Sequence, residues 1–507
     1  MLNHDMRRFF LETMFFAGIF VAMFLFFTVA HPLALYDGDD WLDLSMMRRA
    51  IPLPRGYNPV KVLPEDLFPL VGTIAANMVL PLIGDYIYAV AVTSAAVFGL
   101  LICIYMYLFY RFIEHCFSMS YPRSMLFTIL FLSLHFSLFY SHKSNPIPYL
   151  FGSIDLNCIY HYVIPAIVNL CLVLYFAHYD FKNLGISEQL TDTDDEKRLF
   201  NLNIASSGLL VFVIYLAIFS NILLSIILSA YISAVLLLRF FHKRQNRTNY
   251  RQFIKDNWVY FAILSMWLIS IFLEANGGRS HDIGHSMLSL PVMDTAKIFI
   301  ATITKISKDF WAAGLLLVAS SLCISLKKKS AEYSSILKLY LLTTLIVLSY
   351  LLLVCSKANP EYIGRSDVFI AIIIWMVLLF CISLAYLVKI LPRIGVILPI
   401  VVLYFIVVAC IGEGIYQDSV ISNGISAKEC ITVDRDIIQQ VQLADCNGEK
   451  TVVVHVPKGD DHDNWPHPIY MGPRLAHTLY KHGMTSKMMD ITIQPDVSMN
   501  EKYHIRK

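Results

Sequence analysis

Apolar runs of about 20 residues recur along the chain and are separated by shorter polar segments. A run of this length suits a membrane-spanning helix, which also satisfies its own backbone hydrogen bonds in lipid. The pattern predicts eleven spans, at 9–30, 86–110, 125–141, 159–178, 205–220, 222–240, 258–273, 309–326, 338–355, 367–388 and 395–412. The fifth and sixth share one run that is broken at Ser220-Asn221. We therefore expect an all-α polytopic membrane domain over residues 1–412.

Basic residues gather in the N-terminal segment and in the connections that follow even-numbered spans. They lie in Met1–Arg8, in Phe241–Asn257, at Lys327–Lys329, and at Lys389 and Arg393. Cytoplasmic loops of membrane proteins carry an excess of Lys and Arg. A cytoplasmic N-terminus places all these segments on the cytoplasmic side, and eleven spans then leave the C-terminus outside.

The polar region at 413–507 is expected to form a separate, small α/β domain on the extracytoplasmic side. It contains strand-like runs at Ile431–Val433, Thr451–Val456 and Met489–Ile493, with turn signals such as Asn447-Gly448 between them. Its two cysteines, Cys430 and Cys446, would face an oxidising compartment, so we expect a disulfide between them.

Composition agrees with a membrane protein. The chain is 57% apolar and 15% charged, whereas soluble domains carry about 25% charged residues. Its formal net charge of +2 favours no class of partner. The sequence contains no Walker A, GxGxxG, HExxH or CxxC motif, which argues against an ATPase, a dinucleotide enzyme and a zinc protease.

The strongest candidate chemistry is an acidic cluster in the first predicted loop, at about 31–85. Asp37, Asp39 and Asp40 surround Gly38 and precede Trp41, where the first span meets water. Neighbouring carboxylates raise one another's pKa, which suits a general base near neutral pH. Trp41 adds an aromatic ring beside these acids. The alternative is a hydrated loop whose acids solvate the end of the span.

Three further polar segments could line the same site. One joins the third and fourth spans and contains His142, Lys143 and His161. Its alternative role is an interfacial belt of Tyr and His. The second contains Gly277-Gly278-Arg279, where glycines let the backbone approach an anion and an arginine can grip a phosphate. The third contains Arg365. A separate stretch, Ser286–Lys308, is expected to form an amphipathic helix in the interface.

These features together resemble a known family. The chain combines Tyr36-Asp37-Gly38-Asp39-Asp40-Trp41 after the first span, about ten further spans and a polar C-terminal region. It resembles the GT-C membrane glycosyltransferases, and more specifically the serotype-converting O-antigen glucosyltransferases of enteric bacteria and their bacteriophages. Further motifs carry this resemblance over nearly the whole chain: Asn58-Pro59, Val62-Leu63-Pro64-Glu65, Asn276-Gly277-Gly278-Arg279, Asn464-Trp465-Pro466 and Gly483–Pro495.

The resemblance implies a glucosyltransferase of the bacterial inner membrane that modifies lipopolysaccharide. Such enzymes move glucose from undecaprenyl phosphate glucose to a sugar of lipid-linked O-antigen, with inversion, and work beside a small flippase and a donor-making glucosyltransferase. It implies Asp39 or Asp40 as the base, with Asp37 third, and no metal, cofactor or nucleic acid. Carried over in this way, the substrate-binding candidates are Trp41, Asn58, Glu65, His142, Lys143, His161, Arg279 and Arg365.

Two other classes stay open. A transporter or flippase of a lipid-linked sugar would also place ionisable groups at the ends of spans, although the sequence shows no internal symmetry of the kind such proteins carry. A non-enzymatic accessory protein of O-antigen assembly is the second alternative.

Overall fold

The computed structural model of the chain describes residues 4–47, 50–54, 60–138, 149–153, 155–183, 204–245, 250–277, 289–411, 420–421 and 425–505. Each of the eleven predicted runs corresponds to a helix. They begin with α1 (His4–Leu25) and its continuation η1 (Phe26–Ala30), and go on with α5 (Tyr86–Phe117), α6 (Tyr121–Ser137), α8 (Ile164–Asn183), α10 (Ile204–Ile218) and α11 (Ile222–Gln245). The remaining ones are α13 (Trp258–Ala275), α16 (Lys308–Lys327), α17 (Glu332–Ala358), α18 (Ser366–Ile390) and α19 (Leu398–Ile411).

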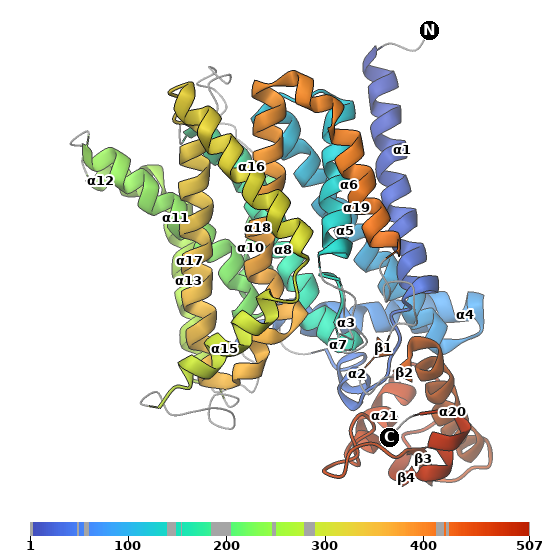
Figure 1. The fold of residues 1–507 in the computed structure, drawn as a ribbon. Helices are drawn as coiled ribbons and strands as arrows, with labels where there is room; N and C mark the ends of the chain where they lie inside the picture. The colour runs from blue at the N-terminus through green and yellow to red at the C-terminus, as the bar shows by residue number, and fades with distance from the viewer. Residues whose placement is uncertain are drawn as a thin grey trace.

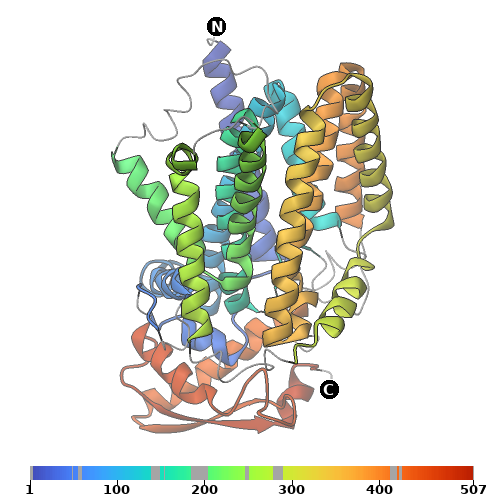
Figure 2. The ribbon, with the colours of Figure 1, turned by 90° about the vertical axis from the view of Figure 1, so that its left-hand side faces the viewer.

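Within these described residues, nine helices are long and apolar enough to cross a membrane. Eight coincide with predicted spans, and α6, α10 and α19 are shorter, at 17, 15 and 14 residues. The ninth, Val62–Ile83, lies within the segment that the sequence placed in the first loop, and it was not predicted as a long apolar helix. It comprises α3 (Val62–Ile74), η2 (Ala75–Val79) and α4 (Leu80–Ile83), and it runs across the end of the bundle rather than along it (Figures 1 and 2).

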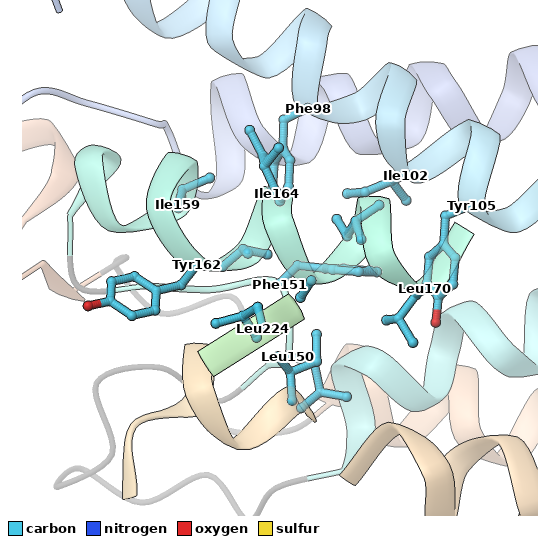
Figure 3. Close-up of a cluster of buried hydrophobic side chains, with 14 of the residues drawn as sticks. Phe98, Ile102, Tyr105, Leu150, Phe151, Ile159, Tyr162, Ile164, Leu170 and Leu224 are labelled. Atoms are coloured by element: carbon cyan, nitrogen blue, oxygen red, sulfur yellow. The ribbon is translucent and has the colours of Figure 1, made fainter. Parts of the chain in front are cut away.

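The core of the bundle lies between α5, α8, α11 and α18, with α1 and α6 against α5 and with α16 and α17 against α18. Figure 3 shows Phe98, Ile102 and Tyr105 of α5 near Ile164 and Leu170 of α8, with Phe151 among them. Leu150 and Phe151 come from the segment that leads into α7 (Leu156–Cys158) and η3 (Ile159–Val163), and both are fully buried. The polar segment that follows is therefore anchored by its apolar neighbours.

A buried ion pair connects α8, α11 and α13. Asp180 of α8 is fully buried and accepts hydrogen bonds from Arg239 (2.6 Å), Tyr260 (2.7 Å) and Tyr231 (2.9 Å). Arg239 also donates to the Asn257 side chain at 2.6 Å. A charge inside a bundle is costly unless it is paired and hydrogen-bonded, and here both conditions are met.

The C-terminal domain, which we define as residues 425–505, contains a parallel βαβ unit. Strand β3 (Thr451–Pro457) pairs with β4 (Asp490–Asp496) in register from Thr451 opposite Asp490, and α21 (Met471–Lys481) connects them. The predicted strands at Thr451–Val456 and Met489–Ile493 are confirmed, although β3 ends one residue later and β4 three residues later than expected. Ile431–Val433 instead lies inside α20 (Ala427–Cys446), whose Ser426 and Glu429 form a capping box.

The expected Cys430–Cys446 disulfide is wrong. Both cysteines are free, and Cys430 is buried whereas Cys446 is exposed. They lie on the same helix, 16 positions apart, which corresponds to about 24 Å along its axis. A disulfide requires Cα atoms within about 7 Å of each other.

The amino end of α1 and the C-terminal domain lie at opposite ends of the bundle (Figure 1). The connection from α16 to α17 and the one from α18 to α19 lie at the same end as the amino terminus (Figure 1). Lys327–Lys329, Lys389 and Arg393 lie in or directly beside these connections, so these basic residues gather at one end of the molecule.

Candidate functional site

The acidic cluster forms the start of a short helix, α2 (Gly38–Asp43), beside the C-terminal domain. Asp37 is its N-cap: its side chain accepts hydrogen bonds from the backbone N–H of Asp39 (2.9 Å) and Asp40 (3.1 Å). Asp40 completes a capping box by accepting from the Asp37 N–H at 3.3 Å. Carboxylates satisfy free N–H groups at a helix start and complement its dipole. The side chains of Asp37 and Asp40 therefore stabilise the start of α2.

Asp40 also fastens this helix to the rest of the bundle. Its side chain is fully buried and accepts from the Tyr36 N–H at 2.8 Å and from the Asn157 N–H, just inside α7, at 2.6 Å. Burial, and then the charge of Asp155, raise the pKa of Asp40, while its backbone hydrogen bonds act in the opposite direction. Its oxygens are thus occupied by backbone donors.

Asp37 and Asp155 form a buried carboxyl pair. Asp37 is 1% exposed and Asp155 7% exposed, and their side chains hydrogen-bond to each other. Burial raises the pKa of both carboxyl groups, and for Asp37 the charge of Asp155 adds to this effect. Two carboxylates in one site cannot both ionise cheaply. The pair therefore favours uptake of a proton more than two separate, solvated carboxyl groups would.

Asp39 differs from its two neighbours because its side chain is 47% exposed. Arg474 of α21 contacts its Oδ1 atom at 2.5 Å. Among the described residues, the Asp39 side chain has no other hydrogen-bond or ion-pair partner, so its Oδ2 atom is not engaged by any of them. Of the three aspartates in the cluster, Asp39 is therefore the one that a substrate can reach.

Arg365 lies close to the same carboxyl pair, since its charge acts on the pKa of Asp155. It is bidentate to Asp367, with Nε–Oδ1 at 3.0 Å and a terminal nitrogen to Oδ2 at 2.7 Å. Its guanidinium also lies over the ring of Tyr162 at 4.7 Å and donates to Cys158 Sγ at 3.2 Å. The segment after the third predicted span and the start of α18 thus meet here.

His161 is buried on η3. Its Nδ1 lies 2.9 Å from the Asn157 carbonyl and its Nε2 lies 4.0 Å from Asp43. Asn221, at the break between the fifth and sixth predicted spans, donates to the His161 carbonyl at 2.8 Å. The sequence drew attention to that break without indicating that it supports the site.

The other predicted site residues divide into two groups. Trp41 is fully buried, so its ring does not face solvent, and Glu65 is buried in α3. Asn58, His142, Lys143 and Arg279 lie outside the described residues, so their expected roles stay predictions.

Sequence reasoning missed the contribution of the C-terminal domain. Arg474 contacts Asp39 from 435 positions away, and no spacing rule connects them. Asp434 of α20 is fully buried, with neither carboxyl oxygen bonded to a described residue, and burial followed by the charge of Asp40 raises its pKa. His467 packs against Tyr36 with ring centroids 5.0 Å apart, and burial lowers its pKa to about 3.

Within the described part of the chain, no group of three or more His, Cys, Asp or Glu residues is arranged to hold a metal ion. No protein-family model matches the chain, and neither a curated protein nor a solved structure does. The chemistry of the site has to be inferred from its own residues.

Proposed function

We propose that the protein is an inverting membrane glycosyltransferase that moves glucose from undecaprenyl phosphate glucose to a sugar of lipid-linked O-antigen. The observation that carries the proposal is the open carboxylate of Asp39, held at the end of an apolar helix bundle beside buried acidic and basic groups. A lipid-linked donor and a lipid-linked acceptor would both present their sugars at the end of the bundle where Asp39 lies. The resemblance of the acidic cluster and its surroundings to the O-antigen glucosyltransferases supplies the reaction class.

Asp39 is the general base in this proposal. As the acceptor hydroxyl attacks C1 of the donor glucose, its proton passes to the Asp39 carboxylate and a new C1–O bond forms. The bond between C1 and the phosphate oxygen breaks, and undecaprenyl phosphate leaves with the electron pair. A single displacement inverts the anomeric carbon. A positioned base of this kind contributes about 10²–10⁴-fold to the rate.

Asp40 and Asp37 support the base rather than replace it. Asp40 is enclosed by three backbone N–H donors, and Asp37 caps α2 and shares a hydrogen bond with Asp155. Arg365 is the described cation that we assign to the leaving phosphate, because a guanidinium can bind phosphate bidentately. Phosphate would have to share or replace its contact with Asp367. Arg279, Lys143 and His142 remain further candidates for this role.

The membrane placement belongs to the same proposal. We place the protein in the bacterial inner membrane, with the amino terminus in the cytoplasm and the C-terminal domain in the periplasm. The arrangement that supports this is the gathering of Lys327–Lys329, Lys389 and Arg393 at the end opposite the C-terminal domain.

Glucose transfer by the purified protein tests the proposal directly. The donor is undecaprenyl phosphate carrying labelled glucose, and the acceptor is lipid-linked O-antigen repeat. We expect Asp39→Asn to lower kcat by about 100-fold or more, because the amide keeps the shape and cannot accept the proton. Asp461→Asn is the matched control, since Asp461 is 96% exposed and its nearest charged partner is Lys458.

Two results would contradict the proposal. If the wild-type protein releases no undecaprenyl phosphate, it is not a transferase, and movement of the uncleaved labelled lipid between leaflets would make it a transporter. If transfer occurs and Asp39→Asn matches Asp461→Asn, the function stands and the base lies elsewhere.

A further inference from the structure

The C-terminal domain is joined to α2 along the whole length of that short helix. At its start, the Gly38 N–H donates to the Pro466 carbonyl at 3.1 Å. At its middle, Thr478 of α21 donates to the Trp41 carbonyl. Just after its end, Ser45 lies 2.7 Å from the Thr478 hydroxyl and 3.0 Å from Nδ1 of His477. Figure 1 shows α2 and α21 side by side at this junction.

The domain also approaches α2 very closely. A Cβ atom added to Gly38 would lie 2.7 Å from Cγ of Pro468, which is closer than side chains tolerate. The helix that carries Asp39 is therefore enclosed between the bundle, which holds Asp40 through Asn157, and the C-terminal domain. Its position is set by both.

Arg474 is the charged group in this junction that touches Asp39. One terminal nitrogen contacts Asp39 Oδ1 at 2.5 Å and the Gly38 carbonyl at 3.3 Å, and the guanidinium lies 4.6 Å from the centroid of the Tyr470 ring. Three contacts thus locate the guanidinium itself. It engages one carboxylate oxygen and leaves Oδ2 without a partner among the described residues.

We propose that Arg474 is a positioning residue for the base, so that the C-terminal domain completes the active site. This inference rests on the proposed function, in which Asp39 accepts the proton of the acceptor hydroxyl. A half-exposed aspartate rotates freely about its side-chain bonds. Arg474 fixes one oxygen and thereby directs the other toward the acceptor, and a misplacement of about 1 Å can cost about 100-fold in rate.

The domain offers a matched control for simple docking. Arg435 of α20 makes a second ion pair with the bundle, to Asp85 before α5 at 2.6 Å. Arg435 and Arg474 therefore both join the C-terminal domain to the bundle through one arginine–aspartate contact. The two arginines differ in one respect: Arg474 contacts Asp39, the proposed base, whereas Arg435 contacts none of the residues to which we assign a role in the reaction.

The test compares Arg474→Ala, Arg474→Lys and Arg435→Ala in the full-length purified protein, with donor and acceptor varied separately. We expect Arg474→Ala to lower kcat by about 10- to 100-fold and to change KM for either substrate by less than about twofold, because it removes an alignment rather than a binding contact. Arg474→Lys should recover part of the loss, since lysine keeps one charged donor. Arg435→Ala should retain the wild-type kcat.

Three results with the variants, or one with the wild type, would overturn the inference. Normal kcat in Arg474→Ala removes the positioning role while leaving the proposed function intact. An equal loss in Arg435→Ala assigns the effect to docking of the domain. If Arg474→Ala does not fold, the test rests on Arg474→Lys. A wild-type kcat together with a raised KM for the acceptor in Arg474→Lys would make Arg474 a binding residue instead of a positioning residue. Absence of transfer in the wild type removes the proposed function and this inference with it.

Discussion

At the scale of single residues, three neighbouring aspartates have three different environments. Asp37 caps a helix and pairs with Asp155, Asp40 is enclosed by backbone donors, and Asp39 reaches solvent. One residue type therefore provides a cap, an anchor and a candidate base within four positions. The differences come from which side of α2 each side chain occupies.

The buried pair of Asp37 and Asp155 predicts a pH dependence of stability. Because the native pKa of both groups is raised, the folded protein holds protons that the unfolded chain releases. Their stabilising effect is complete at acidic pH and is lost as the pH rises through the native pKa values. Asp155 is the N-cap of α7, where its side chain accepts from the Cys158 N–H. Asp155→Asn keeps a capping side chain and removes one charge, so the melting temperature of this variant in detergent should fall less between pH 5 and pH 8. Each pKa unit corresponds to about 1.4 kcal/mol. Parallel pH curves for this variant and the wild type would rule out the shared proton.

At the scale of elements, the crosswise segment Val62–Ile83 supports the helix that carries the aspartates. A Cβ atom on Gly72 of α3 would lie 2.2 Å from the Leu44 carbonyl at the end of α2, so the two helices touch at backbone level. Gly72→Ala should force them apart at a cost of about 1–3 kcal/mol and lower transfer activity. Gly18→Ala in α1 is the control, because nothing lies within 4 Å of its added Cβ. Thermal unfolding and transfer rate measured on both variants check this, and equal behaviour would mean that α2 does not depend on α3.

At the scale of the whole molecule, the amino terminus and the C-terminal domain lie at opposite ends of the bundle. Cys446 is exposed on this domain and Cys430 is buried in it. A membrane-impermeant maleimide should therefore label Cys446 in cells whose outer membrane alone is permeabilised, and Cys446→Ser should abolish that signal. Cys430→Ser should leave it unchanged. Labelling that appears only after the inner membrane is broken would reverse the proposed orientation.

The sequence alone determined the parts of this protein that depend on local chemistry. Apolar runs located eight of the nine helices in the described residues that are long and apolar enough to cross a membrane, because a helix in lipid needs a continuous apolar stretch. Alternation and turn signals located β3 and β4 for a similar reason. The sequence also located the acidic cluster at Asp37–Trp41, because it lies where the first predicted span ends and polar residues begin.

The tertiary structure alone decided what depends on segments that are distant in the chain. It placed Val62–Ile83 across the end of the bundle although its apolarity suits a span. It also selected Asp39 as the exposed carboxylate and brought Arg474 to it. Local periodicity cannot encode these relations, because they arise when helices and the C-terminal domain pack and exclude water from some side chains while leaving others open.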